Sequence, residues 1–219
     1  RQVYSSSDAV ADSRQFAAGL RDWLRDTAGV RFVLGQNVNR LRTSRGRFEA
    51  VEFDDGEVAA DAALVCTGAW SGQLLRPLGI DPYIYPMRGY SVTLPVGPKS
   101  LNVSATALRH RIVFSRINDE VRIAGYADFR GFRTDADATR IKALVDAARR
   151  FAPLAADYTA KDQQPWGGFR PMTPDGRARV GKTRIDGLYL NTGHGMLGWT
   201  LACASGHEVA LCVAGAPGE

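Results

Sequence analysis

The chain has 219 residues, 45% of them apolar, which is enough to bury a core in one large or two small domains. Its formal net charge of +5 comes with acidic residues interleaved along most of the sequence, so the basic run from Arg40 to Arg47 favours solvated strand faces over a nucleic-acid-binding patch. No apolar run reaches the ~18 residues of a membrane-spanning helix and no signal peptide is visible; the first residue, Arg1, indicates that the gene product starts upstream.

Cysteine and histidine are too few and too scattered to predict a metal site. The three cysteines, Cys66, Cys203 and Cys212, form no CxxC pair, and each lies in an apolar stretch. We therefore expect reduced, buried thiols in a cytoplasmic protein. The three histidines and three cysteines fall at no metal-ligand spacing, and no GxSxG motif occurs, so we expect neither a metal site nor a serine nucleophile.

The first predicted element is an amphipathic helix over Ser13–Ala28, with a cap at Asp12 or Ser13 and a stop at Gly29. VRFVLGQNVNRLRT follows and predicts two strands separated by a break at Gly35. The turn signals SRG and DDG then predict an antiparallel meander of short strands.

Next comes AALVC (62–66), which is apolar on both faces and predicts a strand buried in a mostly parallel sheet. After it, YIYPMRGYSVTLP, RHRIVFSR and EVRIAGYADF predict long alternating strands, the last two joined by a tight turn at Asn118–Asp119. A helix with one apolar face is predicted over Thr134–Phe151. PWGGFRPMTPDGRARVGK then predicts a strand with a turn at Thr173–Gly176.

The chain ends with LYLNTGHGMLGWTLA, which predicts a strand, a glycine loop and an apolar helix over Leu197–Ala214. GHGMLG matches the GxGxxG pattern of dinucleotide-binding folds, but only 21 residues follow Gly198. A true fingerprint needs a second strand with an acidic residue about 20 positions on, so this interpretation fails. A helix start that faces a negatively charged group and a turn without any ligand both remain open.

WGGFRPMTPDG and LYLNTGHGMLGWTLACASG resemble the C-terminal part of bacterial D-amino acid dehydrogenases, within the D-amino acid oxidase-like flavoproteins. The resemblance continues through LVCTGAWSGQLLRPLGI, YPMRGYSVTLP and VRIAGYADFRGF. It implies an α/β fold with part of a Rossmann-like FAD-binding domain and an antiparallel substrate-binding sheet. Residues 1–80 and 171–219 would belong to the FAD-binding domain and 81–170 to the substrate domain. The N-terminal GxGxxG that grips the FAD pyrophosphate is absent from this sequence, so the chain resembles the C-terminal half to two-thirds of such an enzyme.

The resemblance also implies site residues. Arg170, in the GxRP motif, would bind the substrate carboxylate through two parallel hydrogen bonds; a surface arginine is the alternative. Tyr90, Tyr126 and His110 lie on the alternating sheet and are candidates for the substrate pocket, but aromatic residues on sheets usually belong to the core, so packing is the favoured interpretation of each. No side chain is assigned as a catalytic acid or base. The residues implied in FAD binding are Val38, Cys66, Thr67, Gly68, Gly193, His194, Gly195, Met196, Leu197, Gly198, Trp199 and Thr200.

The implied activity is the FAD-dependent oxidative deamination of D-amino acids to 2-oxo acids and ammonia. The resemblance favours a quinone of the respiratory chain as electron acceptor, with the protein in the cytoplasm and in peripheral contact with the inner membrane. A glycine or sarcosine oxidase-like enzyme is the nearest alternative. A truncated, inactive fragment of such an enzyme is the other.

Overall fold

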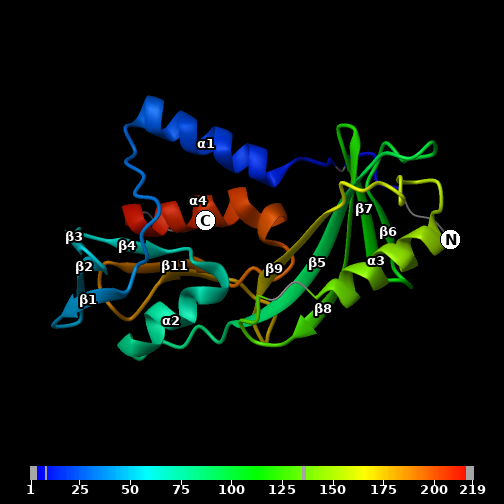
Figure 1. Ribbon diagram of the computed structural model, residues 1–219. Helices are drawn as coiled ribbons and strands as arrows, with labels where there is room; N and C mark the ends of the chain where they lie inside the picture. Colours follow the sequence, from blue (N-terminus) through cyan, green and yellow to red (C-terminus); the bar gives the residue numbers. More distant parts are fainter. Residues whose placement is uncertain (1–3, 8, 135–136, 216–219) are drawn as a thin grey trace. The chain divides into compact units, whose positions relative to one another are not determined.

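The computed structural model describes residues 4–7, 9–134 and 137–215 (Figure 1). The chain divides into two compact units. The first unit comprises Arg1–Arg31, Arg88–Phe129 and Arg133–Gly168. The second unit comprises Phe32–Met87, Arg130–Phe132 and Phe169–Glu219.

The first unit contains most of a five-stranded sheet with the strand order β6-β7-β8-β5-β9. Its strands are β5 (Tyr85–Pro95), β6 (Ala105–Ala107), β7 (Ile112–Ile117), β8 (Glu120–Phe129) and β9 (Gln164–Met172). β7 and β8 pair as an antiparallel hairpin in which Ile117 lies opposite Glu120. The predicted tight turn at Asn118–Asp119 is confirmed, and Asn118 adopts the left-handed backbone conformation that such turns require.

Helix α3 (Ala138–Phe151) packs against β8 and closes the core of this unit. Its predicted apolar face is confirmed, because Leu144, Val145 and Ala148 are buried. The helix begins at Ala138, not at the predicted Thr134, because Asp137 caps it by accepting a hydrogen bond from the Arg140 N–H. Residues 135–136 of the predicted helix lie outside the described residues.

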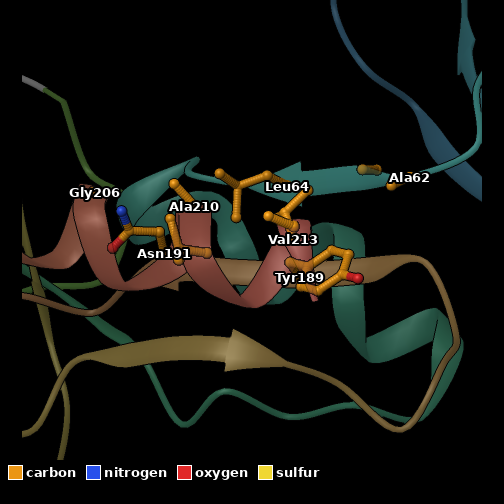
Figure 2. A pocket seen from close by; sticks show the side chains of 10 residues that line it. Ala62, Leu64, Tyr189, Asn191, Gly206, Ala210 and Val213 are labelled. Atoms are coloured by element: carbon orange, nitrogen blue, oxygen red, sulfur yellow. The ribbon is translucent and has the colours of Figure 1, made fainter. Parts of the chain in front are cut away.

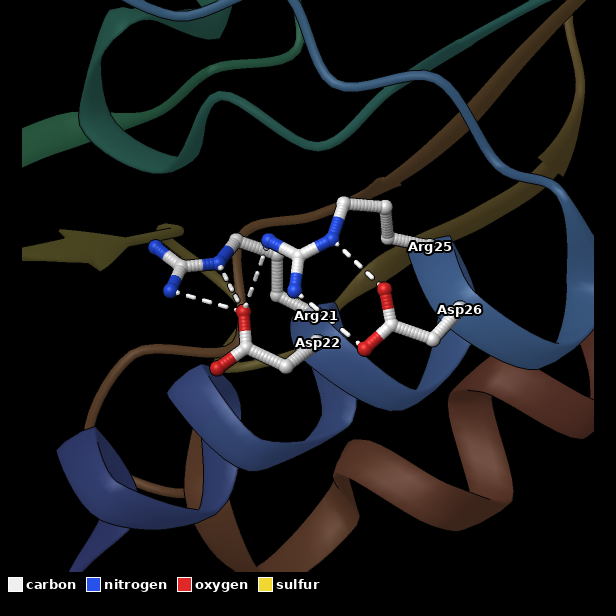
Figure 3. A network of polar contacts seen from close by, with 4 residues as sticks. All are labelled: Arg21, Asp22, Arg25 and Asp26. Carbon is white, nitrogen blue, oxygen red and sulfur yellow. Dashed lines mark hydrogen bonds and ion pairs between the residues drawn. The ribbon is translucent and has the colours of Figure 1, made fainter.

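Helix α1 (Ser13–Ala28) matches its prediction. The Asp12 side chain accepts hydrogen bonds from two first-turn N–H groups, and Gly29 ends the helix in the left-handed conformation. Its surface carries a row of ion pairs in which Arg21 and Arg25 lie 2.9 and 3.3 Å from Asp22, and Arg25 lies 2.8 Å from Asp26 (Figure 3). Such exposed pairs contribute little to stability, because water screens the attraction between the charges.

The second unit contains two three-stranded sheets and α4. The predicted meander is confirmed as β1 (Arg40–Ser44), β2 (Arg47–Phe53) and β3 (Gly56–Ala59), paired antiparallel in that order. The strand predicted before Gly35 is wrong: residues 30–34 are exposed and form no strand. A strand persists only where a neighbour satisfies its backbone groups, and in the described chain no strand pairs with this segment.

The other sheet of this unit has the order β10-β11-β4 and comprises β4 (Ala63–Val65), β10 (Arg179–Lys182) and β11 (Leu188–Thr192). Short helical turns η1 (Gly68–Trp70), α2 (Ser71–Leu75) and η2 (Arg76–Leu78) follow β4, and α4 (Gly198–Ala214) follows β11. The prediction that AALVC is buried on both faces is wrong, since Leu64 is 41% exposed. The predicted burial of the cysteines is also wrong: Cys66 and Cys203 are exposed and Cys212 is half-buried.

Candidate functional site

Two of the predicted cofactor segments leave one sheet at the same edge. β4 and β11 are parallel neighbours, with Val65 opposite Leu190. Their carboxyl ends therefore deliver the Cys66–Gly68 segment and the glycine loop after Thr192 to one place. In α/β sheets, ligands bind outside the carboxyl ends of parallel strands, so this edge is the candidate site in the second unit.

A chain of hydroxyl groups joins the two segments. The Ser71 Oγ lies 3.1 Å from the Thr67 Oγ1 and 2.8 Å from the Thr192 Oγ1. The Thr192 hydroxyl donates to the Gly68 carbonyl at 3.2 Å. Ser71 and Thr192 are fully buried, and neither residue was predicted from the sequence. The signal in the sequence was the presence of small hydroxyl residues near the end of each strand, in TGAWS and LNTG.

The glycine loop is held by its backbone. Gly193 and Gly195 have φ values of 77° and 56°, which side-chain-bearing residues rarely adopt. The Gly195 N–H donates to the Pro171 carbonyl at 3.0 Å, and a Cβ on Gly195 would lie 3.1 Å from the Met172 sulfur. The loop therefore lies directly against the end of β9.

The loop ends at an open helix start. Leu197 occupies the N-cap position of α4 and makes no side-chain capping hydrogen bond. The first backbone hydrogen bond of the helix runs from the Leu201 N–H to the Leu197 carbonyl. The first-turn N–H groups have no acceptor within the helix, and together they favour a negatively charged or carbonyl oxygen placed before them.

His194 brings a buried polar atom to the same loop. Its Nε2 is buried, and no hydrogen-bond partner for it occurs in the described parts of the chain. Burial lowers the pKa of the imidazole below its ordinary value of 6.5, so the ring is neutral at pH 7. A buried ring nitrogen of this kind is costly unless a bound group satisfies it.

Arg170 lies on β9, two residues before Met172, and strand alternation puts the two side chains on the same face. The guanidinium is half-buried, and burial lowers its pKa. Within residues 4–7, 9–134 and 137–215, Arg170 has no ion-pair or hydrogen-bond partner. Met172 lies against Gly195, so Arg170 belongs to the strand that borders the glycine loop in the second unit.

The predicted pocket tyrosines lie in the first unit, and their polar ends are engaged there. Tyr90 is 3% exposed within the core, and its hydroxyl donates to the Asp128 Oδ2 at 3.0 Å. Asp128 also accepts two hydrogen bonds from Arg140, at 2.7 and 2.9 Å. The Tyr126 hydroxyl donates to the Ala143 carbonyl at 3.3 Å. Their role in substrate binding stays a prediction.

The other predicted residues are divided between the two units. Val38 is exposed in the segment before β1, where the amide of Asn39 donates to Asp54 at 2.6 Å. Cys66 is exposed as a residue, but neighbouring atoms partly shield its thiol and raise the thiol pKa. His110, in the first unit, packs its ring 5.1 Å from that of Phe151.

Comparison with known proteins places this arrangement in a family. Residues 1–211 match the family described as FAD dependent oxidoreductase. The chain belongs to this family. The D-amino acid dehydrogenase of Rhizorhabdus wittichii is 37% identical over 211 residues, which cover 95% of this chain and 50% of the relative. The chain spans about half the length of the curated relatives it matches.

Two solved structures share the fold of this chain. An iminodiacetate oxidase from Chelativorans sp. BNC1 matches with a TM-score of 0.80 and 26% identity, covering 94% of this chain and 56% of that protein. A glycine oxidase from Geobacillus kaustophilus matches with a TM-score of 0.80 and 24% identity, covering 91% of this chain and 54% of that protein.

FAD is the cofactor of the family, and the second unit carries features that fit part of it. Leu197 gives the start of α4 no side-chain cap, and no hydrogen-bond partner for the His194 Nε2 occurs among the described residues, so a bound ring system would have polar groups to contact at both places. The glycine loop allows such a ring to approach the backbone closely. In the part of the chain that the structure describes, no helix has the length and apolar content needed to cross a membrane.

A separate apolar groove of about 510 Å³ lies between α4 and the strands β4 and β11. Figure 2 shows Leu64 of β4, Tyr189 of β11 and Val213 of α4 around it. α4 is apolar around most of its circumference, yet only Ser205 and Val209 are buried. Helices that are apolar all round are normally covered on every side. An apolar face of α4 is therefore exposed in the described part of the chain.

Proposed function

We propose that this chain forms the flavin-ring and substrate-carboxylate side of an FAD-dependent D-amino acid dehydrogenase. The pyrophosphate grip would come from a polypeptide with the N-terminal strand, glycine loop and helix. The completed enzyme is the assembly of this chain with that polypeptide. The family match, the D-amino acid dehydrogenase relatives and the half-length coverage support this proposal.

The observation that carries the proposal is the state of Arg170. A half-buried guanidinium whose pKa is lowered by burial, with no anionic partner among the described residues, is ready to receive an anion. An amino acid carboxylate fits its planar fork through two parallel hydrogen bonds. Such a pair fixes the orientation of the substrate as well as its charge, because both oxygens are held.

Arg170 would orient the substrate, and the glycine loop would orient the flavin. Its N–H groups and the start of α4 would hold the C2 carbonyl end of the flavin and favour negative charge there. FAD, when bound, supplies the acceptor for the hydride that leaves the substrate Cα. The resulting imino acid is then hydrolysed by water to a 2-oxo acid and ammonia.

No side-chain base is required in this scheme. His194, the ionisable side chain of the loop, has its pKa lowered by burial and stays neutral at pH 7, where it would donate or accept a hydrogen bond without changing charge. Positioning by Arg170 and the loop would carry most of the rate enhancement. Electrons would leave through a quinone-type acceptor.

Stereochemistry tests the proposal. The completed enzyme should reduce an artificial dye acceptor with D-alanine or another D-amino acid and not with the L-isomer. Equal rates with both isomers would contradict it.

A glycine or sarcosine oxidase-like activity is the second candidate. The two solved structures with a TM-score of 0.80 are an iminodiacetate oxidase and a glycine oxidase, and both share the fold of this chain. Turnover of glycine or sarcosine with prompt release of hydrogen peroxide would favour this candidate over the dehydrogenase.

A further inference from the structure

The buried hydroxyl chain has a direction that follows from counting hydrogens. Each hydroxyl donates one hydrogen. The Thr192 hydroxyl uses its hydrogen on the Gly68 carbonyl. In the 2.8 Å contact between Ser71 and Thr192, Ser71 is therefore the donor, and in the 3.1 Å contact Thr67 donates to Ser71. The hydrogen bonds are therefore donated in one direction, from the Thr67 hydroxyl to Ser71, from Ser71 to Thr192 and from Thr192 to the Gly68 carbonyl.

These hydrogen-bonded hydroxyl groups join two parts of the fold, and Ser71 and Thr192 are 121 residues apart in sequence. Thr67 and Gly68 form the turn after β4, and Thr192 is the last residue of β11, directly before the glycine loop. Ser71 is 0% exposed and Thr192 is 2% exposed, so water does not compete for their hydrogen bonds. Extending the β4–β11 register by two residues from Val65 and Leu190 puts Thr67 opposite Thr192. The hydroxyls thus continue the sheet where its backbone ladder stops.

We propose that Ser71 and Thr192 are positioning residues that fix the glycine loop at 193–198 against the Thr67–Gly68 turn, so that both segments meet the flavin at a set spacing. This inference rests on the proposed function for the identity of the ligand. The backbone ladder ends at Val65 and Leu190, and beyond it the hydroxyl contacts join the two segments. Preorganising both loops lowers the ordering cost of binding, which is where the hydroxyls contribute.

Paired substitutions separate the hydroxyl from the shape of the side chain. T192V keeps the volume of Thr192 and removes the hydroxyl, whereas T192S keeps the hydroxyl and removes the methyl group. S71A removes the middle hydroxyl of the three that are hydrogen-bonded in series. S205A is the matched control, because Ser205 is also buried in the second unit and, among the described residues, its hydroxyl donates to the Ala202 carbonyl of its own helix.

The first measurement is amide hydrogen exchange of residues 193–198 by mass spectrometry, in the completed enzyme stripped of FAD. We expect exchange to be about tenfold faster in S71A and T192V, as the loss of a buried hydrogen bond allows, and unchanged in T192S and S205A. Unchanged exchange in T192V, or equally fast exchange in T192S, would overturn the proposal. In the second case packing of the methyl group, and not the hydroxyl, would hold the loop.

The second measurement is FAD affinity by fluorescence titration of the same proteins. S71A and T192V should bind FAD about tenfold more weakly, and T192S and S205A should bind like the wild type. Equal affinity of wild type and T192V would also overturn the proposal. A wild-type completed enzyme that binds no FAD would contradict the proposed function instead, and the exchange measurement, which needs no FAD, would still decide whether the hydroxyls fix the loop.

Discussion

Replacing Arg170 with lysine tests how this site binds its substrate. Lysine keeps the positive charge and much of the length but replaces a planar fork by a single ammonium group. Arg170 has no competing partner among the described residues, so the substitution changes the contact to the substrate without releasing a carboxylate of the protein. Lysine would therefore keep one of the two charge-assisted hydrogen bonds that Arg170 would donate to the substrate carboxylate and lose the other.

The size of the effect follows from that hydrogen bond. A hydrogen bond to a charged group contributes roughly 1.5–3 kcal/mol, and Arg170 is only half-buried, so solvent weakens it toward the middle of that range. A loss of about 2 kcal/mol corresponds to a fall in kcat/KM of about 30-fold. Most of it should appear as a higher KM, because the carboxylate contact is present both in the bound substrate and in the transition state.

The assay is steady-state reduction of a dye by D-alanine in the completed enzyme, with FAD content measured from the visible spectrum. R170K should retain full FAD content. R177K is the matched control, since Arg177 is exposed in the turn that follows the same strand, and its kinetics should equal those of the wild type. Unchanged kinetics in R170K would remove Arg170 from the site, and loss of FAD together with activity would assign it to folding or cofactor retention.

Three further predictions concern the second unit. The pKa of His194 lies below its unfolded value of 6.5, so the unfolded chain binds the proton first and stability should fall as the pH drops through about 6.5 and below. Urea unfolding of H194Q should show a smaller fall, and identical pH profiles would contradict the assignment. The Arg179 side chain and the Arg177 N–H lower the pKa of Asp175 to about 2, so its stabilising contribution should be complete above the unfolded value of about 3.9 and disappear as the pH falls from there through about 2. D175N should lack that acid-sensitive component, and an acid unfolding curve with the wild-type shape would refute it. G195A should destabilise the fold by about 1 kcal/mol or more and weaken FAD binding, because a φ of 56° is strained for alanine and its Cβ would press on Met172; G206A, in open space on α4, is the control, and equal unfolding midpoints for the two variants would count against the strain.

Local signals in the sequence predicted the local structure well. The cap at Asp12, the hairpin turn at Asn118–Asp119 and the strand, loop and helix at the C-terminal end all depend on neighbouring residues, and the structure contains them. Features that depend on a partner far away in the sequence were predicted poorly. Residues 30–34 have strand composition but no strand beside them, and the short edge strand β6 was not predicted.

In the candidate site, too, features within a short motif were predicted and contacts between distant segments were not. Arg170 and the glycine loop were found because short motifs contain them. The link between Ser71 and Thr192 was not found, because nothing in either segment indicates that two hydroxyls 121 residues apart lie 2.8 Å from each other. The exposure of Cys66 and Leu64 was missed for a related reason: apolar composition predicts burial only where something covers the surface, and in the described chain that face stays open.

The central claim is that residues 1–219 provide the flavin-ring and carboxylate side of a site whose pyrophosphate grip lies in another part of the enzyme. The decisive measurement is the visible spectrum of the purified chain after incubation with FAD and desalting, beside the completed enzyme treated in the same way. We predict that the chain alone elutes colourless, catalytically inactive and prone to aggregate through the exposed face of α4 and β4, whereas the completed enzyme elutes yellow and is bleached by D-alanine. A stable yellow monomer of the chain alone that is bleached by a D-amino acid would contradict this account.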